Sequence, residues 1–211
     1  MADYVKQVDS YLSLLGYSNE TDTLLTSEEK TVLDQNESVK KTKFKLEELF
    51  DVIERGKRLK ADDRIEGDLA FVTAGTGEMG LSSYIGNKVR VFPENSLTID
   101  MFGTVFYRGY EFGADDHVAV LHDTSGELTR ESLQYMQPII EKTLSGMFSY
   151  SKNFYASDAI GVEIELPINT DNQLDVVFMT KFIKAAQKLT VQNVRKEMDS
   201  KLSAFQKVIL N

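Results

Sequence analysis

The chain has 211 residues and a mass of 23.8 kDa, which suits one domain or one domain with an appendage. Hydrophobic residues make up 42% and charged residues 27%, as in ordinary soluble chains, so we expect a folded protein. The absence of cysteine excludes disulfides, thiolate metal sites and cysteine nucleophiles. With only His117 and His122, a multi-histidine zinc site is excluded as well.

The net charge of −9 taken alone argues against a nucleic-acid partner. The charge is unevenly distributed, however. Residues 38–64 carry nine basic and six acidic side chains, and residues 171–211 carry seven and four. Residues 65–170 carry six basic and fifteen acidic side chains. Two basic segments therefore flank an acidic middle, which weakens the argument against nucleic acid.

We expect neither a membrane span nor a secretory signal. No segment approaches the roughly 18 consecutive apolar residues that a bilayer requires. The first residues, Met1–Tyr4, lack a basic region followed by an apolar stretch. The expected location is the cytoplasm.

The N-terminal segment predicts two short helices. Apolar residues at steps of three, four and three predict an amphipathic helix over residues 3–15; they are Val5, Val8, Leu12 and Leu15. A second helix is predicted from Ser27, the candidate N-cap, to Gln35, with glutamates in its first turn. The polar run over residues 36–42 indicates a linker, and we place the main domain boundary near Lys40.

The middle of the chain reads mostly as strands and turns. Lys45–Phe50 fits either one helical turn or the start of a strand. The later strand candidates are residues 69–73, 88–92, 96–102, 104–107, 118–121 and 162–167. A glycine-rich loop is predicted over residues 74–80 and a helix over residues 132–144. This order favours a β-rich α+β domain over a strict β-α-β repeat.

Residues 171–209 form the clearest predicted element, a long helix. Neither glycine nor proline interrupts them, and apolar residues recur mainly at steps of three and four. A helix starting at Leu174 would be about 54 Å long at ~1.5 Å per residue, longer than a domain of this size is wide. It either folds back on its own domain or, the reading we favour, projects towards a second chain.

Two motifs have both a chemical and a structural interpretation. Asp115, Asp116 and His117, with His122 and Asp123, are candidate divalent-metal or catalytic ligands, but a turn before a strand explains the acids equally well. Gly75–Gly80 superficially resembles a phosphate-binding loop. Its spacing matches neither G-x-G-x-x-G nor a P-loop, which favours a plain connection between strands.

A series of motifs from about Phe44 to Leu202 resembles the DNA-specificity (S) subunits of type I restriction-modification systems, and the related recognition subunits of type IIB enzymes. Its order and spacing are more specific than any single piece. The motifs are Lys45–Phe50, Arg55–Leu59, Phe71–Gly75, Asn95–Arg108, Phe112–Val118 and Ile164–Pro167 ahead of the long helix.

The resemblance implies a target recognition domain of α/β type followed by a long coiled-coil helix, and the element order makes that domain β-rich and α+β. The chain would then comprise an N-terminal helical segment (1–39), a target recognition domain (40–170) and a dimerisation or spacer helix (171–211). Members of the family are not themselves catalytic and hold neither metal nor cofactor. They bind double-stranded DNA and recruit methyltransferase subunits, which use S-adenosylmethionine to methylate adenine, and in restriction complexes a motor and nuclease subunit.

This chain departs from the family pattern, because typical members contain the unit twice and this sequence contains it once. It therefore resembles a half-subunit. Two copies of it in a two-fold homodimer would recognise a split palindrome. The expected dimer interface comprises Phe182, Ala186, Leu189, Val194, Met198, Leu202, Phe205 and Ile209. An acidic interaction protein, or a DNA-mimicking decoy that inhibits restriction-modification enzymes, is the alternative.

Base-contacting residues cannot be transferred from the family, because they vary with the target sequence. Basic and polar side chains are the candidates, since lysine and arginine neutralise phosphates and arginine, threonine and tyrosine donate to phosphates or base edges. The candidate DNA-binding residues are Lys57, Arg58, Lys60, Arg64, Thr73, Thr76, Tyr84, Lys88, Arg90, Arg108 and Lys152.

Overall fold

The computed structural model describes residues 10, 13, 16–17 and 20–209, and within them all side chains except those of residues 20–21, 198 and 202–209. The predicted helix over residues 3–15 lies almost wholly outside this range. The chain forms two compact units, one of residues 39–180 and one of residues 1–38 with residues 181–211. Of the helices in the described part, none is both long and apolar enough to span a membrane.

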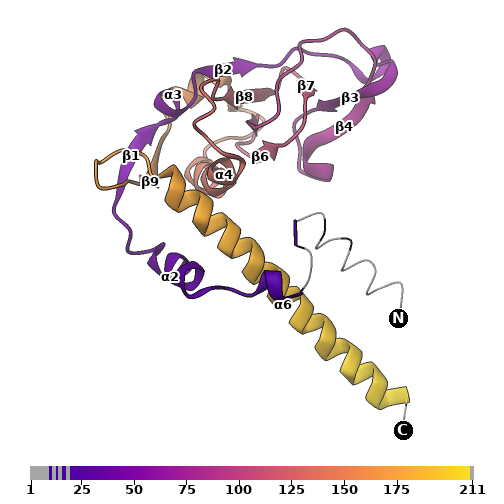
Figure 1. The fold of residues 1–211 in the computed structure, drawn as a ribbon. Helices are drawn as coiled ribbons and strands as arrows, with labels where there is room; N and C mark the ends of the chain where they lie inside the picture. Colours follow the sequence, from indigo (N-terminus) through magenta and orange to yellow (C-terminus); the bar gives the residue numbers. More distant parts are fainter. Residues whose placement is uncertain (1–9, 11–12, 14–15, 18–19, 210–211) are drawn as a thin grey trace. The chain divides into compact units, whose positions relative to one another are not determined.

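The larger sheet of the 39–180 unit is antiparallel, with the strand order β2-β8-β5-β6. Its strands are β2 (Val52–Arg55), β8 (Val118–His122), β5 (Ser96–Asp100) and β6 (Val105–Arg108) (Figure 1). Asp100 pairs with Val118 at one end of the sheet, and Ser96 pairs with both His122 and Arg108 at the other. The register therefore defines two ends, the Asp100 end and the His122 end.

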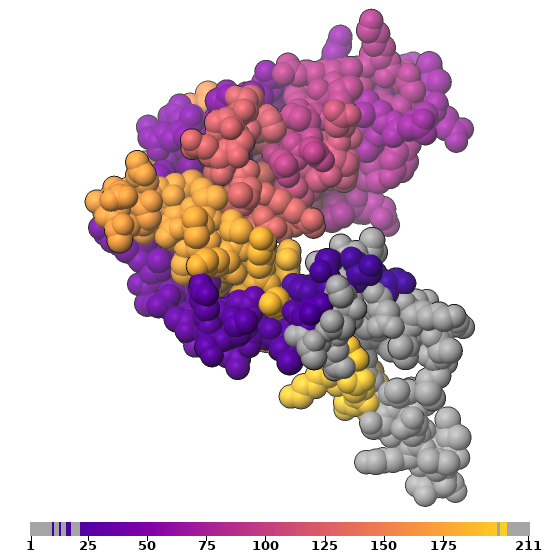
Figure 2. All heavy atoms as spheres, viewed as in Figure 1, coloured from indigo at the N-terminus to yellow at the C-terminus, as the bar shows by residue number. Residues whose placement is uncertain are grey.

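The smaller sheet has the order β4-β3-β7 and is built on a hairpin. Strands β3 (Glu66–Val72) and β4 (Leu81–Ile85) are antiparallel, while β7 (Phe112–Ala114) runs parallel to β3. The hairpin and the segment after it, violet to magenta, lie at the surface on the face shown in Figure 2. The glycine-rich segment connects β3 to β4 through the 3₁₀ turn η3 (Gly77–Gly80), so it is the plain connection between strands that its spacing favours.

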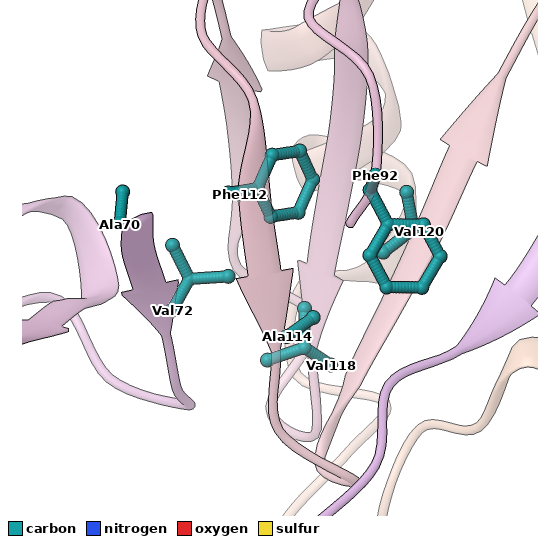
Figure 3. Packing of buried hydrophobic residues seen from close by; sticks show 7 residues of the cluster. All are labelled: Ala70, Val72, Phe92, Phe112, Ala114, Val118 and Val120. Atoms are coloured by element: carbon teal, nitrogen blue, oxygen red, sulfur yellow. The ribbon is translucent and has the colours of Figure 1, made fainter. Parts of the chain in front are cut away.

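Apolar side chains from both sheets meet in one core (Figure 3). Phe92 and Phe112 stack with ring centroids 5.6 Å apart, beside Val72 of the small sheet and Val120 of the large one. The core cluster comprises Ala70, Val72, Phe92, Phe112, Ala114, Val118 and Val120. Because side chains alternate across a strand, Ala119 and Leu121 of β8, next to these inward positions, face the other way.

The other face of the larger sheet is covered by helix α4 (Arg130–Leu144), which contacts β5 and β6 (Figure 1). The helix buries Leu133, Met136 and Ile140 at the spacing of one helical face. Thr129 caps it by accepting a hydrogen bond from the backbone N–H of Ser132. A two-sheet core with one covering helix confirms the predicted β-rich α+β class.

The predicted linker over residues 36–42 is partly wrong. Strand β1 (Lys41–Lys45) pairs antiparallel with β9 (Glu163–Pro167), more than a hundred residues away. Its polar side chains are mostly exposed, which is why the segment resembles a linker; only the backbone pairing makes it a strand. The helical turn α3 (Leu46–Leu49) follows at once, so the helical alternative for this segment is confirmed.

The strand predicted over residues 88–92 is also wrong. In this segment only Phe92 forms a bridge, donating to and accepting from Phe112 at 2.8 and 3.1 Å. The alternation of polar and apolar side chains reflects an extended chain that lies on the core. Val89 lies so close to Gly113 that a Cβ on Gly113 would clash with it. The other connections are the 3₁₀ turn η2 (Ala61–Asp63) and helix α5 (Ala156–Ala159).

The unit of residues 1–38 and 181–211 contains η1 (Glu20–Thr23), α2 (Ser27–Gln35) and most of α6 (Val176–Ile209). Helix α2 is capped by Thr26 rather than by the predicted Ser27. Thr26 is extended, and its hydroxyl accepts from the backbone N–H of Glu29 at 3.2 Å while the Glu29 carboxylate accepts from Thr26 N at 2.8 Å. The 34-residue α6 confirms the long helix.

Candidate nucleic-acid interface

Several loops of the 39–180 unit meet at the Asp100 end. Lying there are the carboxyl ends of β2, β3 and β7, the start of β8, and the β5–β6 turn. The strand registers bring them together, because β3 runs parallel to β7 and Asp100 pairs with Val118. Backbone hydrogen bonds join them: Asp115 N donates to Val72 O, and Lys57 N donates to Ala114 O, both at 2.9 Å. Loops held by a rigid scaffold are the usual carriers of recognition.

The Asp100 carboxylate links two of these loops. It is 4% exposed, and its Oδ1 accepts from the backbone N–H groups of Phe102 and Thr104, each at 2.9 Å. Its Oδ2 accepts from Gly75 N at 3.0 Å. A buried carboxylate is tolerated here because three backbone donors satisfy it. The sequence contains Asp100 without any sign of this role, since Gly75 is 25 residues away.

The loop after β3 presents polar and apolar side chains from a constrained backbone. Thr73 N donates to Gly80 O at 2.9 Å and Met79 N to Thr76 O at 3.2 Å. Glu78 and Met79 have φ values of 46° and 53°, in the left-handed region that non-glycine residues rarely occupy. Met79 is 59% exposed. The predicted residues Thr73 and Thr76 lie in this loop, and Thr76 is exposed.

The basic segment after β2 lies against the turn between β7 and β8. A Cβ on Gly56 would lie 2.3 Å from the carbonyl oxygens of Ala114 and Asp115, so the backbones pack in contact. The predicted residues Lys57 and Arg58 follow, and both are exposed. This segment therefore presents Lys57, and Arg58 in an ion pair with Asp116, at the same end as Thr76.

The acidic cluster Asp115–His117 neutralises neighbouring arginines. Asp116 lies 3.6 Å from Arg58, 3.4 Å from Arg55 and 3.0 Å from the His117 ring. Desolvation opposes ionisation of Asp116, but the Asp115 hydrogen bond and these cations outweigh it and lower the Asp116 pKa. Burial, together with Asp116, raises the pKa of Asp115.

The metal or catalytic alternative for this cluster has no geometric support. In the part of the chain that the structure describes, no group of three or more histidine or acidic side chains is arranged to hold a metal ion. His122 and Asp123 lie at the opposite end of β8 from Asp116. The sequence-adjacent ligands are therefore separated by the length of a strand.

A second set of candidates lies along the hairpin and the segment after it. Arg64 donates to Ser82 Oγ at 2.8 Å and its guanidinium lies 4.9 Å from the Phe71 ring centroid. Arg90 pairs with Glu54 and lies over Phe92. These two guanidinium groups therefore fasten the extended segments to the sheets. The exposed candidates of this set are Lys60, Tyr84, Lys88 and Arg90, of which Arg90 is held in the ion pair with Glu54.

The structure places Arg108 in the interior, not at the surface. Its side chain is 2% exposed, donates to Thr98 Oγ1 at 3.0 Å and to the Tyr110 hydroxyl at 3.2 Å, and lies over the Phe106 ring. Burial lowers the pKa of this guanidinium. The predicted role of Arg108 as a surface contact to DNA is therefore wrong, because its guanidinium is held inside the domain.

The two ends of the larger sheet differ in charge. At the His122 end lies a cavity of about 480 Å³ lined by acidic and apolar side chains. Its lining residues are Phe44, Glu47, Glu48, Leu49, Asp51, Asp123, Ser125, Glu127, Leu128 and Leu174. Five carboxylates and no basic residue line this cavity. At the Asp100 end, in contrast, Asp116 forms ion pairs with Arg55 and Arg58. The carboxylates at the His122 end would repel a polyanion.

In the other unit, residues 23–29 contact α6 of their own chain. Lys181 and Lys188 form ion pairs of 2.7 Å with Glu28 and Glu29, and Gln192 donates to Thr23 O at 2.6 Å. Sequence reasoning missed this packing. Buried Val191 lies between Lys188 and Gln192 on the same face of the helix.

The predicted dimer residues lie partly away from that packed face. Leu189 is 37% and Val194 50% exposed, while Phe182 and Ala186 are half-buried. The side chains of the other four candidates lie outside the described set; they are Met198, Leu202, Phe205 and Ile209. Exposed apolar groups on a long helix mark a surface that can pack on another helix.

A two-sheet domain with recognition-type loops at one end, followed by a 34-residue helix, is the architecture of a modular binding protein. The family model described as "Type I restriction modification DNA specificity domain" matches residues 38–196. The chain belongs to this family. The predicted family resemblance is confirmed.

Solved structures show the same fold at low sequence identity. An S subunit of a type I restriction-modification system from M. genitalium matches with a TM-score of 0.54 and 11% identity, covering 98% of this chain and 55% of that one. A structure described as showing complex assembly and conformational transition of the type I R-M system matches with a TM-score of 0.56 and 17% identity, covering 99% and 55%.

A third match is the HsdS subunit from Thermoanaerobacter tengcongensis, with a TM-score of 0.50, 15% identity and coverage of 99% and 54%. The chain therefore spans about half the length of these structures. A comparison with curated proteins gives no match.

Proposed function

We propose that this chain is a DNA sequence-specificity half-subunit of a restriction-modification methyltransferase complex. The observation that carries the proposal is the family match over residues 38–196 in a chain that spans about half the length of the solved S subunits. The chain itself is not an enzyme in this proposal. Adenine methylation belongs to methyltransferase subunits that bind S-adenosylmethionine, and a motor and nuclease subunit joins in restriction complexes.

Two copies pairing through α6 restore the missing half. The exposed apolar residues Leu189 and Val194 support this arrangement, since both leave apolar surface on α6 accessible among the described residues. An isologous dimer presents the same reading surface twice, so the target is a split palindrome. The Asp100 end is the proposed DNA-facing end, with Lys57, Arg58 and Thr76 exposed there.

The first test is the mass in solution by light scattering. We expect a value near twice 23.8 kDa for the parent. The double variant Leu189→Asp with Val194→Asp should be monomeric, because two charges per chain would be buried in the interface. Val177→Asp is the matched control, since Val177 is a 66% exposed valine of the same helix outside the predicted interface. A monomeric parent, or a double variant that still dimerises, contradicts the dimer.

The second test is target-directed methylation by the parent chain assembled with methyltransferase subunits. Mapping of methylated adenines in DNA should give one split palindrome that depends on this chain. If the chain instead inhibits the methyltransferase without directing it to a sequence, the decoy alternative replaces the proposal.

A further inference from the structure

The segment between α4 and α5 folds into a tight turn that exposes a tyrosine. We call residues Phe148–Phe154 the Tyr150 turn. Ser149 N donates to Lys152 O at 2.9 Å and Lys152 N to Ser149 O at 3.0 Å, which closes a four-residue loop. The hydroxyls of Ser149 and Ser151 are hydrogen-bonded at 3.0 Å. In the amide orientation that satisfies its side chain, Asn153 donates to Ser149 O at 2.9 Å.

Aromatic contacts fasten this turn to the Asp100 end. Phe154 is 3% exposed, its ring lies edge-on to Phe148 at 5.0 Å, and its backbone N–H donates to Met101 O at 2.9 Å. Phe102 lies edge-on to Tyr150, also at 5.0 Å. Because the Asp100 carboxylate holds Phe102 N and Gly75 N, the Tyr150 turn and the loop after β3 share one support.

The tip of the turn contributes little to folding. Tyr150 is 85% exposed, more than any other large hydrophobic side chain among the described residues, and Met147 is 49% exposed. An exposed aromatic ring on a pre-ordered backbone loses little conformational freedom on contact, which is the arrangement that binding surfaces use. The rigidity comes from the buried Phe154, so the exposed Tyr150 is available for a ligand.

The charge around the turn favours a polyanion. Residues 142–157 contain two lysines and no acidic residue, in a chain with 33 acidic residues among 211. Lys152 is exposed and lies over the Phe148 ring at 5.6 Å, which places its ammonium beside the turn. Lysine, serine and tyrosine are side chains that donate to phosphate and sugar oxygens, and tyrosine also offers a ring to a base edge.

We infer that the Tyr150 turn is a DNA-contacting element of the recognition surface. In this inference, which rests on the proposed function, Tyr150 contacts a base or sugar and Lys152 a backbone phosphate. Of these two residues, only Lys152 is among the DNA-binding residues predicted from the sequence. The turn then joins Lys57, Arg58 and Thr76 at the Asp100 end as one surface.

The test uses the full chain assembled with methyltransferase subunits and a pool of duplexes that carry a randomised stretch. We expect Tyr150→Ala to weaken binding to the selected sequence about tenfold and to relax the preference at one position of each half-site, as loss of one base contact does. Tyr150→Phe keeps the ring and removes the hydroxyl, so it shows which of the two groups makes the contact. We expect Lys152→Ala to weaken binding to all sequences alike and to reduce the slope of log K against log salt by about one.

Lys41→Ala is the matched control for Lys152→Ala, because Lys41 is an exposed lysine in β1, outside the Asp100 end. The inference is overturned if the parent selects a sequence and both Tyr150→Ala and Lys152→Ala keep its affinity, sequence preference and salt slope. Loss of the methyltransferase subunits from the Tyr150→Ala complex during gel filtration also overturns it, since the turn would then bind protein. A parent complex without sequence preference refutes the proposed function and the inference together.

Discussion

At the residue scale, Arg108 is a buried cation that neutral groups surround. In the described part of the chain, its hydrogen-bond partners are the hydroxyls of Thr98 and Tyr110, and no carboxylate pairs with it. Desolvation of the guanidinium therefore opposes folding, whereas the packed side-chain stem and the two hydrogen bonds favour it. The position of Arg108 between the sheets makes it a structural residue.

The first prediction concerns this balance. Arg108→Ala should lower the free energy of unfolding by about 3 kcal/mol, because it leaves a cavity and removes the hydrogen bonds to the Thr98 and Tyr110 hydroxyls. Arg108→Met should cost less than half of that, since methionine refills the space without burying a charge. Urea denaturation of both variants checks the difference. Equal losses would mean that the charge, not the volume, is what the fold requires.

Asp51 gives a prediction about pH. Its carboxylate accepts from the hydroxyl and from the backbone N–H of Thr124, the latter at 2.8 Å, and these hydrogen bonds lower its pKa. A depressed carboxyl pKa contributes stability above the unfolded-state value of about 3.9, and that contribution is lost as the pH falls through the folded-state pKa. Asp51→Asn should therefore lower the melting temperature at neutral pH.

The difference between parent and Asp51→Asn should shrink as the solution is acidified below about pH 4, where the parent carboxyl is protonated as well. Melting temperatures measured across this range check the prediction. A difference in melting temperature that does not change with pH would show that the effect comes from the geometry of the hydrogen bonds and not from the charge of Asp51.

At the element scale, Glu29 serves two contacts. One oxygen accepts from Thr26 N in the capping box of α2, and the other lies 2.7 Å from Lys188 of α6. The two side chains of the ion pair are 22% and 18% exposed, so solvent screens it only partly. Glu29→Gln keeps a capping acceptor and removes the ion pair, whereas Thr26→Ala removes the cap and keeps the pair.

We predict that Thr26→Ala lowers the stability of α2 by about 1 kcal/mol. Glu29→Gln should instead weaken the contact between α2 and α6 by roughly 1 kcal/mol. Hydrogen exchange of residues 27–35 measures both: Thr26→Ala should accelerate exchange mainly in the first turn, and Glu29→Gln along the whole helix. The same exchange pattern in both variants would show that cap and ion pair act as one unit.

Elements with strong local patterns were predictable, and those fixed by distant partners were not. Helix α4 and helix α6 follow from apolar spacing alone. Strand β1 exists because β9 pairs with it, and the extended run ending at Phe92 lacks such a partner except at its last residue. At the candidate site, exposed lysines are identifiable by type, but the burial of Arg108 and the anchoring by Asp100 depend on contacts across the sheets.

At the scale of the whole molecule, the proposed dimer makes α6 a spacer between two reading surfaces. If two copies of α6 pair antiparallel, the separation of the half-sites depends on helix length, and helix length depends on residue number. Seven residues are nearly two helical turns, so inserting them lengthens the helix by about 10 Å and rotates the following residues by only about 20°. Five inserted residues rotate them by roughly 140°.

Duplicating residues 195–201 should therefore preserve the dimer and lengthen the gap between the two halves of the target by about three base pairs, at ~3.4 Å each. The half-sites should stay unchanged, because the 39–180 unit is untouched. Mapping methylated adenines in DNA from cells that make the complex checks both expectations. An insertion of five residues from the same stretch is the control, and it should abolish dimerisation by displacing the apolar stripe from its partner. A seven-residue insertion that leaves the gap unchanged would refute the role of α6 as the spacer, since the two reading surfaces would then be positioned by contacts outside the helix.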